Sequence, residues 1–140
     1  MKKAYFIPLI AIIFILIWFG LQSKPEKMAA YHITLANPNQ YANGVFTDIL
    51  KIQKGSYQFS FVPNGDSPQT LSIILKGKNF SYAQDLKLNG TLHNTGISSY
   101  YTWDYSGNKS VDIPLDQDLQ IIINPHGNTL GSISVDLRKI

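Results

Sequence analysis

The chain has 140 residues and no cysteine, and 44% of its residues are hydrophobic. This length is sufficient for one compact domain and a short additional segment. The lack of cysteine excludes disulfides, thiolate nucleophiles, zinc–thiolate sites and blue-copper centres. Lys2 and Lys3 supply most of the formal net charge of +3 at pH 7, so the rest of the chain is nearly neutral. Because the other lysines are scattered singly, we expect no nucleic-acid partner.

The N-terminal segment predicts a membrane anchor. The lysine pair precedes an uncharged run over residues 5–21, which is about as long as the shortest helix that spans a bilayer. Trp18 near its outer end suits the aromatic belt of a membrane interface. A cleaved signal peptide has the same basic start, with residues 21–23 as a marginal cleavage site. We expect an uncleaved single-pass anchor with a cytoplasmic N-terminus, or a secreted protein if the segment is cleaved.

A third interpretation of this segment is a pilin-like surface subunit, because a basic and a small residue also precede the hydrophobic helix of prepilins. Such subunits continue the helix well past the membrane, whereas Pro25 prevents much continuation here. We therefore expect an anchor or signal sequence over residues 1–23, a linker over residues 24–30 and an extracytoplasmic domain over residues 31–140.

The domain is predicted to be all-β, because short alternations of apolar and polar residues are separated by Gly, Pro, Asn and Asp. Residues 45–52 fit a strand or a short turn of helix. In the run over residues 85–94, Leu86, Leu88 and Leu92 are expected to share one inward face. The expected strands cover residues 31–35, 45–52, 56–62, 70–77, 85–94, 99–106, 118–124 and 131–140.

Two turn sequences, at residues 63–66 and 125–128, predict hairpins in which glycine supplies the positive φ. Short strands with one apolar face each cannot all be buried by a single open sheet. We therefore predict an antiparallel two-sheet β-sandwich of about seven to nine strands, in immunoglobulin-like or jelly-roll style.

The stretch ISSYYTWDYSG, residues 97–107, contains four aromatic side chains. Strand alternation places Tyr101, Trp103 and Tyr105 on one face, where they would fill the core of a small sandwich. If that face instead points outward, the rings could stack on a sugar while nearby carboxylates and amides bond its hydroxyls. A compromise puts Trp103 in the core and Tyr100 at the surface. The candidate ligand-binding residues are Tyr100, Tyr101, Trp103, Asp104 and Tyr105.

Signals for a metal site are weak. His32, His93 and His126 are far apart and belong to no metal-binding spacing, so they form a site only if the fold gathers them. Asp116 and Asp118 could contribute oxygens to calcium, but acidic residues before an apolar strand commonly form a solvated turn. No cofactor is expected.

The chain also lacks G-x-S-x-G and any phosphate-binding glycine motif, so we expect no catalytic activity. N-x-S/T triplets at Asn79, Asn89 and Asn108 are possible glycan acceptors in a translocated domain, although Asn89 and Asn108 equally suit turn residues that bond their own backbone.

These patterns together predict a membrane-anchored binding or scaffolding module that contacts a surface polymer, or a protein or glycan partner in the cell envelope. The alternative is a metal or small-ligand carrier, or an unrecognised enzyme, that uses the scattered His and Asp residues. Convergence of the three histidines would favour that alternative.

Overall fold

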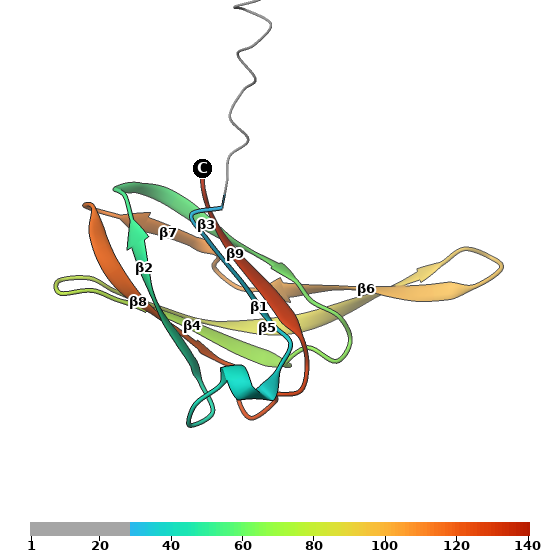
Figure 1. The fold of residues 1–140 in the computed structure, drawn as a ribbon. Helices are drawn as coiled ribbons and strands as arrows, with labels where there is room; N and C mark the ends of the chain where they lie inside the picture. Colours follow the sequence, from blue (N-terminus) through green and yellow to red (C-terminus); the bar gives the residue numbers. More distant parts are fainter. Residues whose placement is uncertain (1–28) are drawn as a thin grey trace, which may run out of the picture.

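The computed structural model describes residues 29–140, so the predicted anchor and most of the linker lie outside the described residues. Two antiparallel sheets pack face to face (Figure 1), which confirms the predicted two-sheet, all-β architecture. No helix within residues 29–140 has the length and hydropathy needed to span a membrane. The strands are β1 (Tyr31–Leu35), β2 (Phe46–Ile52), β3 (Gly55–Val62), β4 (Thr70–Lys76), β5 (Ser81–Asn94), β6 (Ser99–Ser106), β7 (Ser110–Ile113), β8 (Gln117–Asn124) and β9 (Ile133–Lys139), with a 3-10 helix, η1, over Pro38–Gln40.

One sheet has the strand order β1-β9-β3-β7 and the other has the order β2-β8-β4-β5-β6. All eight predicted strands are present close to their expected bounds, and residues 45–52 form a strand rather than a helical turn. β7 was not predicted from the sequence. Its four residues are too few to establish an alternating pattern, and it is held by pairing with the start of β3.

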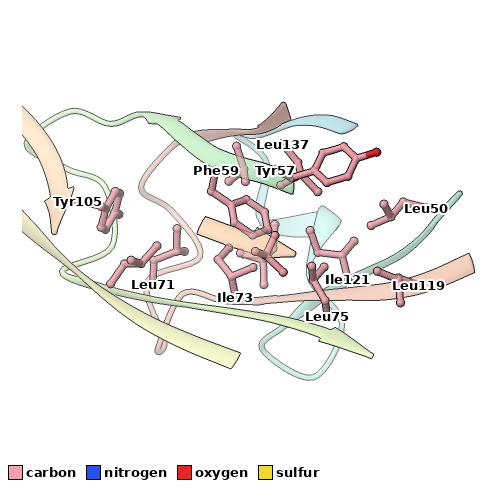
Figure 2. Close-up of a cluster of buried hydrophobic side chains, with 14 of the residues drawn as sticks. Leu50, Tyr57, Phe59, Leu71, Ile73, Leu75, Tyr105, Leu119, Ile121 and Leu137 are labelled. Carbon is pink, nitrogen blue, oxygen red and sulfur yellow. The ribbon is translucent and has the colours of Figure 1, made fainter. Parts of the chain in front are cut away.

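The core lies between the two sheets, where the inward residues of each strand interdigitate. Figure 2 shows this cluster, with Tyr105 and Leu71 at one end and Leu50 and Leu119 at the other. Ile73 and its cross-strand partner in β8, Ile123, are both fully buried. Burial of each large aliphatic side chain contributes about 1.5–3 kcal/mol to stability, so the alternation seen in the sequence accounts for the packing of the sheets.

Neither of the two predicted hairpin turns forms a hairpin. Backbone bonds from Ser67 N to Asn64 O (3.1 Å) and from Asn128 N to Pro125 O (3.2 Å) do reverse the chain. However, β3 and β4 belong to different sheets, as do β8 and β9, so each turn carries the chain across the core. Gly127 has the expected positive φ of 90°, whereas Gly65 does not have a positive φ. Turn residues determine where a chain reverses, but burial of the apolar faces determines which strands pair.

The β5–β6 hairpin extends beyond the rest of its sheet (Figure 1). β4 pairs with β5 only as far as Lys87, and one further backbone bond runs from Leu88 N to Gln69 O (2.9 Å). From there outward β5 pairs only with β6, up to Asn94 opposite Ser99. We call residues 89–103 the arm. The prediction that Leu92 faces the core is wrong: it is 49% exposed, because no opposing sheet reaches this far.

Candidate binding surface on the projecting arm

The tip of the arm is a tight two-residue turn. Thr95 N donates to Ser98 O (2.9 Å), which leaves Gly96 and Ile97 as the two central residues. Gly96 has a φ of 84°, the conformation that favours glycine at the first central position of a hairpin turn. Ile97 is 98% exposed, so a large aliphatic side chain stands at the outermost point of the arm.

One face of the arm continues the core-facing side of the sheet and is apolar. It carries Leu92 opposite Tyr101 and Gly90 opposite Trp103. The Tyr101 and Trp103 rings lie nearly parallel, with centroids 5.7 Å apart and an interplanar angle of 27°. Trp103 covers Gly90, where an added Cβ would lie 2.7 Å from the indole ring. These rings form a continuous row, in which Tyr101 is 56% exposed.

The opposite face of the arm is ordered by a second group of side chains. His93 and Tyr100 are cross-strand partners whose rings stack with centroids 4.9 Å apart and an interplanar angle of 15°. His93 Nε2 also hydrogen-bonds to Thr102 Oγ1 (2.8 Å). Cross-strand pairs of this kind are the main stabilising contacts of a two-stranded ribbon, which is marginally stable without them.

The structure divides the predicted aromatic set between core and surface. Tyr105 is buried, and its hydroxyl donates to Pro68 O (2.6 Å). Burial also raises the pKa of Tyr105. This side chain is a core residue out of reach of a ligand. Trp103 is half-buried at the boundary, whereas Tyr100 and Tyr101 are exposed. Asp104 is exposed and forms an ion pair with Lys109 (3.2 Å).

The outer edge of β6 presents unpaired backbone groups. In an antiparallel ladder, successive residues point their N–H and C=O alternately toward and away from the neighbouring strand. Tyr105 N–H points away from β5, because it donates to the Asp104 carboxylate (2.8 Å). By alternation, the backbone N–H and C=O groups of Trp103, Tyr101 and Ser99 also point away from β5. Within residues 29–140, no strand other than β5 pairs with β6.

The arm contains no Asp, Glu, Lys, Arg or Pro between residues 89 and 103. Edge strands are usually protected against pairing by charged side chains, proline or bulges. The arm therefore combines an apolar row, an open backbone edge and a lack of charge, which suits contact with a neutral partner and not with a charged one.

The three histidines lie on separate elements and have different partners. His32 Nδ1 is 2.6 Å from Asp136 Oδ1, His93 contacts Thr102 on the arm, and His126 lies in the turn after β8. Across the part of the chain that the structure describes, no three His, Asp or Glu side chains converge as a metal site requires. The convergence that would favour a metal carrier is not found there.

The remaining candidate residues occupy turns and exposed strand positions. Asp116 accepts the Lys54 N–H (2.8 Å), and Asp118 is paired with Lys51 across β2 and β8. Asn79 is exposed between β4 and β5. Asn89 donates to Ser106 Oγ (2.7 Å), and Asn108 accepts the Ser110 N–H (3.0 Å) as an Asx turn does.

Ser72, Asp85 and His126 form a cluster that the sequence motifs do not indicate. Ser72 Oγ is 2.6 Å from His126 Nε2 and also hydrogen-bonds to an Asp85 carboxylate oxygen. An ionised carboxylate only accepts, so the hydroxyl proton points to Asp85 and His126 Nε2 must donate to Ser72. His126 is thus not placed as the base of a nucleophilic triad, and the cluster instead fastens the turn after β8 onto β4 and β5. The pairing of β4 with β5 places Ser72 opposite Asp85, and nothing in the sequence indicates that His126 joins them.

A shallow hollow of about 700 Å³ lies near the base of the arm, lined by β3, the end of β9 and Asp104 of β6. Phe61 lies in its wall beneath Lys109, whose Nζ is 5.9 Å from the ring centroid. Lys109 is also paired with Asp104, and Arg138 and Lys139 add further positive charge to the lining. Within residues 29–140, the exposed large aromatic side chains, Tyr100 and Tyr101, both lie on the arm. Comparison with known protein families, curated proteins and solved structures finds no match to this chain.

Proposed function

We propose that this protein is a membrane-anchored, extracytoplasmic binding or scaffolding module without catalytic activity, which contacts a surface polymer or a membrane-complex partner through the arm. The observation that carries the proposal is the arm itself. It extends beyond the sandwich, exposes Tyr101 and Leu92 on one face and Tyr100 on the other, and leaves one backbone edge unpaired. Exposed apolar side chains gathered on one projecting element are typical of an interaction site.

The anchored and extracytoplasmic parts of the proposal depend on residues 1–23, whose basic start and uncharged run suit a single membrane span. We also propose that the domain is immunoglobulin-like or jelly-roll-like, since two antiparallel sheets are common to both classes. The anchor would keep the arm near the membrane surface, where a partner in the envelope can reach it.

Site-specific photo-crosslinking of the full-length chain in its own membrane tests this function. A photoreactive phenylalanine analogue is placed at Tyr101 on the arm or, as the control, at Ile49, which is 61% exposed on β2. We expect a crosslinked partner, either polymer or protein, from position 101 and not from position 49. A further change, Leu92→Ser, should reduce the yield because it removes the cross-strand neighbour of Tyr101. No product from position 101, or equal products from both positions, would refute the proposal.

A further inference from the structure

We propose that the partner of the arm is a second copy of this chain. Residues 99–103 of one copy would pair antiparallel with the same residues of the other, about a twofold axis at Tyr101. This inference rests on the proposed function, because it names the occupant of the same surface. The pairing would join two five-stranded sheets into one continuous sheet.

The spacing of the outward backbone groups is self-complementary. The backbone groups of Ser99, Tyr101 and Trp103 point away from β5, and Tyr101 is the middle residue of the three. In the antiparallel pair centred on Tyr101, Ser99 of each copy lies opposite Trp103 of the other, so every outward N–H and C=O has a partner. The two Tyr101 rings then meet at the axis, and the apolar row of one arm continues into that of the other.

The open edge ends where this pairing ends. The Asp104 carboxylate accepts the Tyr105 N–H and thereby occupies the next outward donor along β6. A partner strand therefore finds free groups only as far as Trp103. A longer peptide or strand from another protein would form no further backbone hydrogen bonds beyond Trp103, whereas the proposed pair uses the whole open stretch.

The opposite edge of the same sheet is blocked in its middle. On β2, Asp48 Oδ1 accepts the Ile49 N–H (2.8 Å), and Asp48 Oδ2 accepts the Tyr31 hydroxyl (3.0 Å). Lys51 adds a second charge to this strand. Charged side chains on an edge strand disfavour pairing with another strand. The β2 edge of this sheet is therefore protected against pairing, whereas the β6 edge over residues 99–103 is not.

Charge also favours a second copy over a charged partner. Because residues 89–103 carry no Asp, Glu, Lys or Arg, two arms meet without like-charge contact, and an acidic or basic ligand would find no counter-charge there. Pairing over five residues buries less than the roughly 1,200 Å² of a stable soluble complex. Confinement of both copies to one membrane raises their effective concentration and compensates for the small interface.

The absence of cysteine from the chain allows a matched crosslinking test. Thr102 on β6 and Thr47 on β2 are both exposed and lie on the two edge strands of the same sheet. The full-length Thr102→Cys and Thr47→Cys variants are reconstituted separately in lipid vesicles and treated with a short bis-maleimide. We expect a covalent dimer from Thr102→Cys and no dimer from Thr47→Cys. Equal yields from both variants, or no covalent dimer from Thr102→Cys, would overturn the proposal.

Proline at the axis separates edge pairing from ring contact. In the Thr102→Cys background, Tyr101→Pro removes an outward N–H that β5 does not use, and proline is tolerated at such edge positions. We expect this variant to lose the crosslinked dimer, whereas Tyr101→Ala keeps the N–H and should retain part of it. Persistence of the dimer with Tyr101→Pro would overturn edge pairing. An unchanged far-UV circular dichroism spectrum shows that the sheets remain folded.

The two proposals fail in different ways. If the Tyr101 photoprobe captures an envelope polymer or another protein while Thr102→Cys forms no dimer, the arm is a binding surface but the second copy is not its partner. If the photoprobe captures nothing and no dimer forms, both proposals are wrong. Dimers of Thr102→Cys together with photoproducts of twice the chain mass support both.

Discussion

The inner and outer halves of the β5–β6 hairpin carry the same kinds of side chain on the same face, yet their surroundings differ. In the inner half, Leu86 and Tyr105 are 1% exposed. In the outer half, Leu92 and Tyr101 are 49% and 56% exposed. The difference arises because the opposite sheet covers only the inner half. The same alternation therefore produces core in one half and a potential interface in the other, and the length of the neighbouring strands decides which.

The largest expected contrast is between two leucines on β5. Leu86→Ala should lower the free energy of unfolding by about 2–5 kcal/mol, because it leaves a cavity in the core. Leu92→Ala should change it by less than about 0.5 kcal/mol, because the side chain is already half in water. Chemical denaturation of both full-length variants measures the difference. A similar cost at both positions would mean that the outer half is covered in the free protein.

Two tyrosines on β6 give a smaller contrast. Tyr105→Phe should cost about 1–3 kcal/mol, because it removes the hydrogen bond to Pro68 O and leaves that carbonyl without its partner. Tyr101→Phe should leave the free energy of unfolding unchanged, since the exposed hydroxyl is solvated. Thermal unfolding of the pair provides the test, and an equal loss from Tyr101→Phe would contradict the assignment of this ring to the surface.

The smallest effect on stability is expected at the boundary between the halves. In Gly90→Ala the new Cβ would lie 2.7 Å from Trp103, so the indole must shift outward. The gain of about 0.5–1 kcal/mol from replacing a strand glycine offsets part of the steric cost. We therefore expect little change in stability but a red shift of Trp103 fluorescence, measured in a Trp18→Phe background. Thr91→Ala, on the opposite face, is the control and should leave the emission unchanged.

The edges of the five-stranded sheet show how a single carboxylate changes the availability of a strand. Asp48 and Asp104 each accept the backbone N–H of the following residue. Asp48 lies near the middle of β2, whereas Asp104 lies toward the end of β6 and leaves residues 99–103 open. Position along the strand, rather than residue type, therefore separates a protected edge from an open one.

Much of the fold is predictable from the alternation of residue types. The eight predicted strands and the two-sheet arrangement follow from one apolar face per strand, because each such face must be buried against another. The short β7 and the sheet-crossing role of the turns at 63–66 and 125–128 are not predictable in this way. A four-residue strand has too short a pattern, and a turn sequence does not specify the sheet to which the next strand belongs.

The sequence by itself determined the alternation in β6, the lack of charge in residues 89–103 and the lack of cysteine. Only the tertiary structure decided which of the aromatic side chains are core and which are surface. Tyr101 and Tyr105 have the same strand parity, so periodicity cannot distinguish them. Their burial depends on where β4 stops and how far the opposite sheet extends, and these are properties of strands that lie far away in the sequence. The open edge of β6 also depends on the tertiary structure, because a strand is an edge strand only if no other strand of the fold pairs with its second side.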